Sequence, residues 1–403
     1  MAHFLLGWEL GGGLGHAGRM KLLAQELLAR GHQVSLSLRD LVQPRRLLAE
    51  LDLPAFQSPV WLHKTMGLPP HPASLAEILL QCGYLDADAL HGLVGGWRTL
   101  LRQLRPDLLV ADYAPTAILA ARSLGLRSAS VGIAFYSPPA RRALPPLRDW
   151  EAVPEQRLRG AEAQLLRTIN GVLARYGAAA MQQGADVLLG DLQLLCTWPE
   201  LDHYGRGADA VAQWYGPTFL PQAGAAPHWP AGAGAPVFAY LKSGHPDHAA
   251  VLQALVDEGC RVLCYMPEVA GGMAPPVRSP LLHYAAGPVS LQSAMREAAL
   301  CVCHGGEATL AQSLLAGVPA LLLPMQTEQF LAARRLQQGG AGVNAAQLAR
   351  PLDWRQLVRQ MLDDGRYRSA AAAFAARYSG FSQQAQVRAL ADALEAQAAA
   401  PAG

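Results

Sequence analysis

The chain alternates between short, continuously apolar segments and longer amphipathic ones. An apolar run of four to eight residues fits a strand that is covered on both faces, and the amphipathic stretches fit the helices that cover it. The pattern therefore predicts an α/β protein built from doubly wound parallel sheets. Expected strands are 3–8, 33–38, 107–111, 128–133 and 186–189 in the first half, and 236–241, 260–265, 299–303 and 319–323 in the second.

Helical spacing of apolar residues is clear at both ends of the chain. Residues 17–30 carry leucines and a methionine at helical spacing, and Gly31 follows as a C-terminal cap. The Ala-rich segment 366–399 predicts one or two further helices.

A Pro-, Ala- and Gly-rich segment, 221–236, separates the two series of strands and predicts a linker. It divides the chain into two Rossmann-like domains, 1–220 and 237–403, and the last helix could pack back on the first domain. Open α/β sheets bind ligands at the carboxyl ends of their strands. We therefore expect the two domains to face a common ligand-binding cleft.

Composition excludes several classes of function. The 403 residues include 33 Lys and Arg and 31 Asp and Glu, a net charge of +2, which does not suit a nucleic-acid partner. Every apolar run ends well before the roughly 18 residues of a membrane span. The first ten residues lack a basic region and a cleavage site, so they are expected to form a strand of a cytoplasmic protein. The pattern predicts no oligomeric state.

A glycine-rich loop follows the first expected strand and leads directly into a helix. Gly13, Gly15 and Gly18 match the dinucleotide-binding spacing, and Asp40 ends the next strand, as in NAD-dependent oxidoreductases. His16 favours another function, because a helix start disfavours positive charge and leaves a neutral imidazole that accepts a proton. A tight turn with a structural histidine is the third alternative, and the loop by itself does not decide.

A second constellation follows strand 299–303. His304, two glycines and Thr309 open a helix, where free N–H groups and the positive dipole end favour a diphosphate. After the next strand, Glu328 and Gln329 offer acceptors and donors that suit a polyhydroxyl ring.

The segment from His304 to Ala333, with its paired glycines, Gly-Val-Pro at 317–319 and an acidic residue before Gln329, resembles a family signature. The family is that of the GT-B nucleotide-sugar-dependent glycosyltransferases of the UDP-glycosyltransferase type, which includes macrolide, flavonoid and rhamnolipid enzymes. Gly15-His16, the strand ending at Asp112, and the segments 199–202 and 215–217 are similar to motifs of its first domain. The resemblance covers most of the chain and is weakest at 41–100 and 137–185.

The resemblance implies an inverting transfer of sugar from a UDP- or dTDP-sugar to a hydroxyl group, without cofactor or metal. His16 would be the general base and Asp112 would orient it. Gln312 stands where the family usually has a glutamate that holds the ribose. The donor contacts implied are Ser243, His304, Gly305, Gly306, Thr309, Gln312, Glu328 and Gln329.

The acceptor is expected to be small and hydrophobic, because aromatic residues occur in the expected loops of the first domain. A lipid-linked acceptor at a membrane surface, with peripheral membrane contact, is an alternative that basic residues beside exposed apolar ones would favour. The acceptor contacts expected are Gly13, Gly15, Trp61, Trp97, Phe135 and Tyr136.

Overall fold

The computed structural model describes residues 1–207, 213–220 and 224–400. It divides into two compact units, Met1–Thr218 with Gln384–Gly403, and Phe219–Gln383. Residues 221–223 of the expected linker, and residues 208–212 of the expected first domain, lie outside the described residues.

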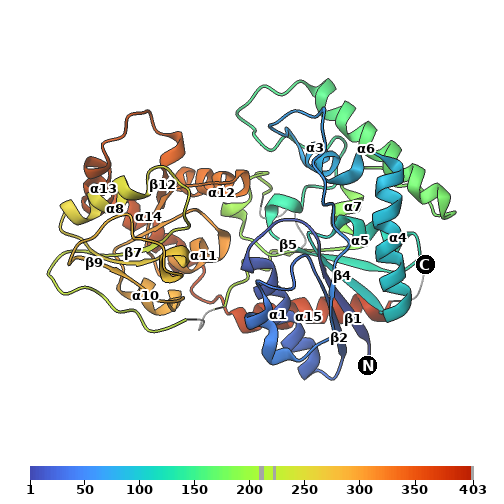
Figure 1. The fold of residues 1–403 in the computed structure, drawn as a ribbon, viewed down its shortest axis with the longest axis horizontal. Coiled ribbons are helices and arrows are strands. Elements are labelled where there is room, and N and C mark those ends of the chain that lie inside the picture. The colour runs from blue at the N-terminus through green and yellow to red at the C-terminus, as the bar shows by residue number, and fades with distance from the viewer. Residues whose placement is uncertain (208–212, 221–223, 401–403) are drawn as a thin grey trace. The chain divides into compact units, whose positions relative to one another are not determined.

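Unit 1 contains a six-stranded sheet in which all strands are parallel, in the order β3-β2-β1-β4-β5-β6 (Figure 1). The first strand lies near the middle and the chain winds outward from it in both directions, as in a doubly wound fold. The strands are β1 (His3–Trp8), β2 (Gln33–Leu38), β3 (Ala55–Gln57), β4 (Leu108–Asp112), β5 (Ser128–Gly132) and β6 (Leu192–Leu195).

Helices cover both faces of this sheet. Side chains of Phe4, Leu6 and Trp8 pack with α1 and α15 on one face, and Gly7 on the other lies against the ring of Trp97 from α4. The α-helices are α1 (Leu14–Ala29), α2 (Arg45–Leu48), α3 (Leu75–Leu79), α4 (Ala87–Leu104), α5 (Pro115–Arg122), α6 (Glu155–Arg175), α7 (Asp186–Leu189) and α15 (Gln383–Ala399). Short helical turns are η1 (Ala49–Leu51), η2 (Leu80–Tyr84), η3 (Ala134–Tyr136) and η4 (Pro199–Leu201).

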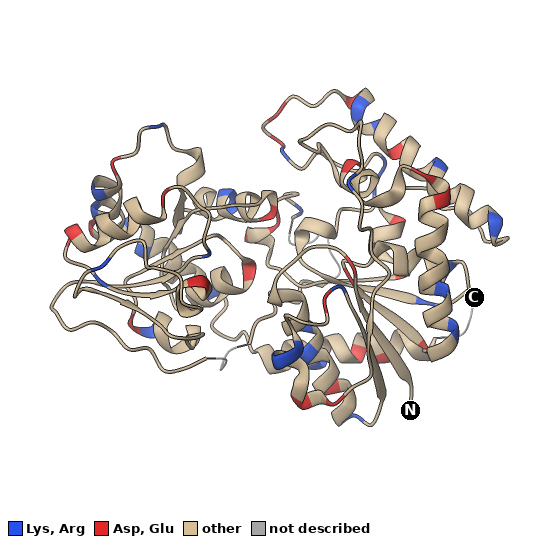
Figure 2. Cartoon of the chain, in the orientation of Figure 1, with Lys and Arg blue, Asp and Glu red and all other residues tan. Residues whose placement is uncertain are grey.

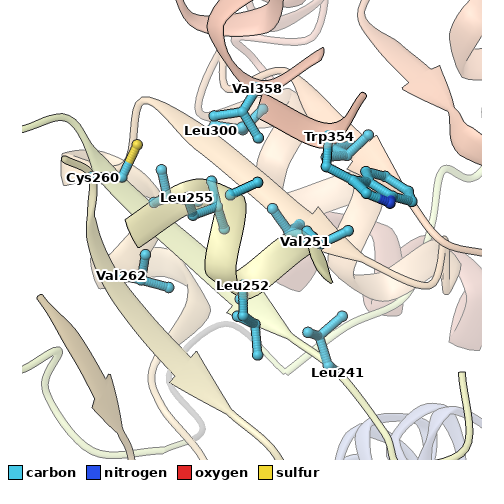
Figure 3. Close-up of a cluster of buried hydrophobic side chains, with 14 of the residues drawn as sticks. Leu241, Val251, Leu252, Leu255, Cys260, Val262, Leu300, Trp354 and Val358 are labelled. Carbon is cyan, nitrogen blue, oxygen red and sulfur yellow. The ribbon is translucent and has the colours of Figure 1, made fainter. Parts of the chain in front are cut away.

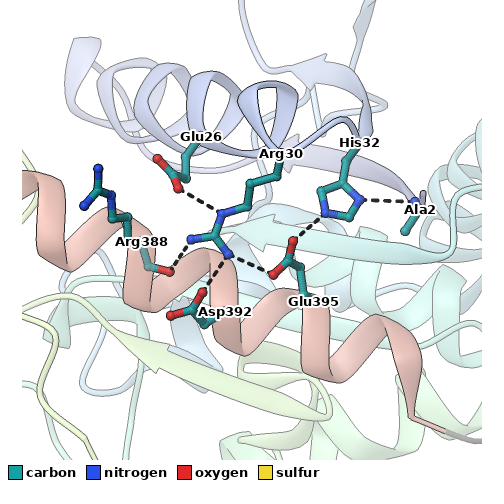
Figure 4. A network of polar contacts seen from close by, with 7 residues as sticks. All are labelled: Ala2, Glu26, Arg30, His32, Arg388, Asp392 and Glu395. Atoms are coloured by element: carbon teal, nitrogen blue, oxygen red, sulfur yellow. Dashed lines mark hydrogen bonds and ion pairs between the residues drawn. The ribbon is translucent and has the colours of Figure 1, made fainter.

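The last helix, α15, belongs to unit 1 although it follows unit 2 in the sequence. Arg30 at the end of α1 reaches Asp392 at 2.6 Å and Glu395 at 2.8 Å, and Nε2 of His32 contacts Glu395 at 2.6 Å (Figure 4). Beneath these contacts, Leu390 of α15 is fully buried in the core of the unit. Helix α15 is therefore fixed to unit 1 by both packing and charge.

The expected strand at 186–189 is wrong, because these residues form helix α7 and the strand is β6 at Leu192–Leu195. Both segments are four residues long and contain three apolar residues each, and periodicity does not distinguish a short buried helix from a strand. Gly190, at φ 63°, separates the two segments.

Unit 2 repeats the same connectivity with a second parallel sheet, ordered β12-β11-β10-β7-β8-β9. The doubly wound α/β architecture expected from the sequence is thus confirmed in both units. Its strands are β7 (Pro236–Tyr240), β8 (Arg261–Tyr265), β9 (Leu282–Tyr284), β10 (Leu300–Cys303), β11 (Ala320–Leu322) and β12 (Gly342–Asn344).

The core of unit 2 forms where Val251, Leu252 and Leu255 of α8 pack against the sheet and against Val358 of α13 (Figure 3). The helices of the unit are α8 (His248–Asp257), α9 (Pro267–Ala270), α10 (Leu291–Glu297), α11 (Glu307–Leu315), α12 (Thr327–Gln338), α13 (Trp354–Asp363) and α14 (Gly365–Arg377), with the short turn η6 (Ala345–Gln347).

Charged residues of both signs are interspersed along the helices of each unit, for example on α4 and α6 (Figure 2). None of the described helices combines the length and the apolar character that crossing a bilayer requires.

Candidate active site

Unit 1 has a candidate site at the switch point of its sheet, where the connections after β1 and β4 leave in opposite directions. Trp8 at the end of β1 pairs with Asp112 at the end of β4. The loop after β1 passes through Gly11 and Gly13 into α1, which places His16 in the first helical turn. Two residues almost a hundred positions apart thus meet at the edge where α/β sheets bind ligands.

His16 and Asp112 form a buried hydrogen-bonded pair. Nδ1 of His16 lies 2.8 Å from Oδ1 of Asp112, and the two side chains are 9% and 0% exposed. Because an ionised carboxylate only accepts, Nδ1 carries the proton and Nε2 of a neutral ring is left as an acceptor. The imidazole stacks on Trp8 at 5.1 Å and on Tyr136 at 5.7 Å, so its plane is fixed.

The Nε2 face of His16 lies against Gly11, a residue that sequence reasoning did not include in the site. A Cβ built on Gly11 would lie 2.7 Å from Nε2, and φ of Gly11 is +77°. Only glycine meets both conditions without strain. The signal was present in the run of three glycines at 11–13.

Asp112 has two further partners that the sequence did not reveal. Nη1 of Arg19 donates to Oδ2 at 2.6 Å, and the hydroxyl of Tyr136 donates to Oδ1 at 2.7 Å. Burial opposes ionisation of Asp112, but the Arg19 guanidinium and His16 outweigh it and hold the pKa of this carboxyl below its ordinary value. The carboxylate is therefore charged at neutral pH.

A second buried carboxyl, Glu9, lies directly after β1. It accepts hydrogen bonds from the backbone N–H of Thr116, at 2.8 Å, and from the Thr116 hydroxyl. Burial raises the pKa of Glu9 from 4.5 to about 7, although these hydrogen bonds and the charge of Arg39 lower it. Sequence reasoning treated this residue only as part of the loop.

Two of the expected acceptor contacts are buried in this structure. Trp97 is completely buried, and its ring fills the space beside the missing side chain of Gly7, so it is a core residue. Tyr136 is 4% exposed and its hydroxyl is engaged with Asp112 and Arg19, so it belongs to the polar network under His16.

The remaining expected acceptor contacts lie on loops and at the start of α1. Trp61 is partly exposed and lies over Gly83, where a Cβ would come within 2.9 Å of its ring. Phe135 is also partly exposed. Gly13 precedes α1, with φ 91°, and Gly15 is exposed in its first turn.

Unit 2 has its own candidate site at the switch point of its sheet, between β7 and β10. Tyr240 and Cys303 are paired at the ends of these strands, and the next residues lead to Ser243 and His304. The same sheet position thus carries the chemically distinctive residues in both units.

The imidazole of His304 is fully engaged by the backbone. Nδ1 donates to the carbonyl of Leu323 at 2.7 Å, and Nε2 accepts the N–H of Lys242 at 2.8 Å. Burial lowers the pKa of His304, so the ring stays neutral with a single N–H. In this structure the ring links the loops after β7, β10 and β11, and the donor contact expected for His304 stays a prediction.

The start of α11 remains suited to an anion because its first N–H groups have no partner within the helix. Gly306 precedes the helix, and Gly305, at φ +89°, approaches the Gln329 carbonyl so closely that a Cβ would lie 3.0 Å from it. This approach brings Glu328 and Gln329, in the first turn of α12, beside the start of α11.

Two buried polar side chains follow on α11. Thr309 and Gln312 are each 6% exposed. Nε2 of Gln312 donates weakly to Ala308 at 3.3 Å, and its Oε1 has no hydrogen-bond partner in the part of the chain that the structure describes. Oε1 is an available acceptor for a ligand hydroxyl.

Ser243 is held in the loop after β7 by hydrogen bonds to Glu268. Although burial favours the neutral acid, bonds from the Ser243 backbone and hydroxyl help to lower the pKa of Glu268. The expected phosphate contact of the Ser243 hydroxyl would require this bond to be exchanged. Lys242 beside it is exposed and adds positive charge to the loop.

Comparison with known proteins gives three kinds of match. The model for the Erythromycin biosynthesis protein CIII-like C-terminal domain matches residues 284–387. The PGL/p-HBAD biosynthesis glycosyltransferase of Mycobacterium tuberculosis is 26% identical over 351 residues, which cover 78% of each chain. The PGL/p-HBAD biosynthesis rhamnosyltransferase of Mycobacterium bovis is 25% identical over 307 residues, covering 71% of this chain and 68% of that protein.

Solved structures share the whole fold at low identity. The spinosyn rhamnosyltransferase SpnG has a TM-score of 0.67 at 19% identity, over 97% of this chain and 100% of its own. SpnG has also been solved with thymidine diphosphate, with a TM-score of 0.65 at 20% identity, over 96% of this chain and 99% of its own. A complex of SpnG with spinosyn aglycone has a TM-score of 0.63 at 20% identity, over 97% of this chain and 100% of its own.

The two doubly wound units and the solved structures give the chain the GT-B fold, and residues 284–387 are similar to the C-terminal domain of the Erythromycin biosynthesis protein CIII-like family. The chain is a glycosyltransferase.

Proposed function

We propose that this glycosyltransferase moves a sugar, with inversion, from a dTDP- or UDP-linked donor to a hydroxyl group of a small hydrophobic acceptor. The observation that carries the proposal is the hydrogen bond from Nδ1 of His16 to Asp112, which leaves Nε2 as a proton acceptor. An alcohol is a weak nucleophile until its proton is removed, and a positioned base is the group that removes it.

His16 takes the acceptor proton at Nε2 while Asp112 stabilises the imidazolium that forms. The acceptor oxygen attacks the anomeric carbon in line with the bond to the diphosphate, which leaves with the electron pair. Direct attack gives inversion at that carbon.

Unit 2 binds the donor. The N–H groups at the start of α11 hold the diphosphate and stabilise its charge as it leaves, so that the reaction needs no metal or cofactor. Gln312 offers Oε1 to a ribose or deoxyribose hydroxyl. Glu328 and Gln329 accept from the hydroxyls of the sugar. SpnG, which shares the fold, has been crystallised with thymidine diphosphate, and this supports a dTDP-linked donor.

Calorimetric titration with dTDP, UDP and NAD tests the donor site. We expect dTDP or UDP to bind with a Kd between about 1 μM and 1 mM, and NAD not to bind. Ala308→Pro removes one N–H from the first turn of α11, where proline is tolerated, and should weaken nucleotide binding about tenfold. Gln156→Pro, at the same position of α6 in unit 1, is the matched control. Binding of NAD in place of the diphosphates would instead favour an oxidoreductase.

A lipid-linked acceptor is a second candidate, favoured by one loop of unit 1. In the loop after β3, Leu62 is 84% exposed and Met66 is 73% exposed, on either side of the exposed Lys64. Apolar side chains beside a cation suit the surface of an anionic membrane. The protein should then sediment with anionic phosphatidylglycerol vesicles, and the double variant Leu62→Ser, Met66→Ser should not.

The control for the vesicle experiment is Val42→Ser, which removes an equally exposed apolar side chain, 82% exposed, from another loop. Absence of sedimentation by the unaltered protein would contradict the lipid candidate and leave the small acceptor.

A further inference from the structure

A buried arginine lies on the far side of the Asp112 carboxylate from His16. We propose that Arg19 is a positioning residue of the transfer reaction, which acts through Asp112 to keep the His16 ring free to accept a proton. This inference rests on the proposed function.

Arg19 and Tyr136 close a triangle around the carboxylate. Nη1 of Arg19 lies 2.6 Å from Oδ2 of Asp112 and 2.9 Å from the Tyr136 hydroxyl, which itself donates to Oδ1 at 2.7 Å. Oδ1 thus receives two hydrogen bonds, from His16 and Tyr136, and Oδ2 receives the guanidinium. The carboxylate at the end of β4 is therefore held in plane by donors from two other elements, α1 and η3.

The charges of Arg19, Asp112 and His16 sum to zero only while His16 is neutral. Arg19 is 5% exposed and Asp112 is completely buried, so water screens their charges little. The other titratable groups that act on the Arg19 guanidinium are Tyr136 and Cys196, both neutral in their ordinary forms. Trp8 covers the other face of the His16 ring and carries no charge.

A buried carboxylate without Arg19 would form an ion pair with an imidazolium, and a ring that is protonated on both nitrogens cannot act as a base. The guanidinium of Arg19 compensates the negative charge of Asp112. The carboxylate can then orient Nδ1–H of His16 without favouring a second proton on Nε2. The acceptor proton then moves to Nε2 only as the new glycosidic bond forms. After the diphosphate departs with its electron pair, the proton leaves to solvent and the triangle returns to balance.

Titration of His16 by NMR tests this role without any substrate. The twelve histidines are labelled at Cε1, and the His16 signal is assigned by its loss in His16→Ala. Arg19→Gln keeps a hydrogen-bond donor but removes the charge, and should raise the His16 titration midpoint by about one pH unit, a tenfold gain in proton affinity. Arg19→Lys keeps the charge and should leave the midpoint within about 0.3 unit of the unaltered protein.

Arg98→Gln is the matched control. Arg98 is also buried, at 7% exposure, but it donates to the Ser123 carbonyl instead of a carboxylate. Its replacement should leave the His16 midpoint unchanged. Tyr136→Phe removes one hydroxyl and no charge, so it is expected to fold even if Arg19→Gln does not, and it should raise the midpoint by less than Arg19→Gln because only one hydrogen bond to Asp112 is lost.

The second readout is the rate of sugar transfer to 4-methylumbelliferone. The donor is the sugar nucleotide whose diphosphate binds in the calorimetric titration described above. In Arg19→Gln the acidic limb of the kcat/KM profile should move to higher pH together with the NMR midpoint, while the KM for the donor stays unchanged. A merely structural role would lower activity at all pH values and move neither. Unshifted midpoints in both Arg19→Gln and Tyr136→Phe would overturn the proposal.

The two levels of inference fail separately. If the unaltered protein transfers sugar and the His16 midpoint does not respond to Arg19, the positioning role is refuted and the proposed function stands. If the midpoint shifts as expected and the unaltered protein transfers no sugar to any acceptor, the proposed function is refuted, and with it the catalytic meaning of Arg19.

Discussion

At the scale of single residues, the surroundings of two buried carboxyl groups in unit 1 shift their pKa values in opposite directions. Asp112 meets a guanidinium, an imidazole and a phenol, and is charged. Glu9 meets the Thr116 backbone and hydroxyl, so burial dominates and the neutral acid is favoured up to about pH 7. Polar groups placed a few ångströms apart thus decide which carboxyl supports a base and which does not.

The raised pKa of Glu9 predicts a pH-dependent stability. Below pH 4.5 the carboxyl is protonated in both the folded and unfolded states, and above about 7 it is ionised in both. Between these values only the unfolded state releases the proton, so the contribution of Glu9 to the free energy of unfolding falls by about 3 kcal/mol as the pH rises. Glu9→Gln should remove this part of the pH dependence in urea unfolding at pH 5 and pH 8.

Glu77 provides the control for this experiment. Burial opposes its ionisation, but the ion pair with Arg157 lowers the pKa of Glu77, so its contribution is lost as the pH falls. Because the pKa of Glu77 is 4.5 in the unfolded state and lower in the folded state, this loss occurs below pH 5. Glu77→Gln should therefore leave the difference in stability between pH 5 and pH 8 nearly unchanged. Equal pH profiles for the unaltered protein and Glu9→Gln would contradict the buried-acid interpretation.

At the scale of elements, the last helix completes the first unit. Helix α15 buries Leu390 and Leu394 against the sheet that carries His16, while Arg30 holds its outer face (Figure 4). Removing a fully buried leucine leaves a cavity as well as losing apolar contact, which together cost about 2 to 5 kcal/mol.

Leu390→Ala should accordingly lower the free energy of unfolding of unit 1 by that amount, measured by chemical denaturation. Gln384→Ala, at an exposed position of the same helix, should change it by less than about 0.5 kcal/mol. Similar stability of both variants would show that α15 contributes little to the unit.

Elements with a distinctive pattern could be predicted from the sequence, and those defined by distant contacts could not. Strands such as β4 and β10 are continuously apolar and lie where they were expected. His16, Asp112 and His304 could be placed because each follows or ends such a strand. The strand expected at 186–189 is wrong because so short a segment with three apolar residues suits either a helix or a strand.

The features of the candidate sites that could not be predicted depend on contacts between residues far apart in the sequence. Tyr136 meets Arg19 across 117 positions, and no pattern near either residue indicates this pairing. The sequence does not show that Trp97 is buried. Its ring lies in the core because Gly7, far away in the sequence, has no side chain and leaves room for it. The backbone partners of the His304 imidazole, Leu323 and Lys242, lie in loops that follow other strands. The sequence near His304 therefore does not indicate them.

At the scale of the whole molecule, the chain uses one sheet connectivity twice for two different tasks. In each unit the distinctive residues follow the first and fourth strands in chain order, β1 and β4 or β7 and β10, which are neighbours at the switch point. Unit 1 offers an imidazole oriented by a carboxylate, and unit 2 offers backbone N–H groups at a helix start. The proposed function therefore assigns the base to unit 1 and the anion site to unit 2.

This division of tasks is tested most directly by measuring transfer and nucleotide binding in the same variant, His16→Ala. We expect the initial rate of sugar transfer to fall at least a hundredfold, because the base is lost, while the Kd for the bound nucleotide stays within about twofold, since its binding groups lie in unit 2. Asp112→Asn should lose about a hundredfold to ten-thousandfold in rate. Transfer at the unaltered rate by His16→Ala, or an equal loss of transfer and nucleotide binding, would contradict the assignment of His16 as the base.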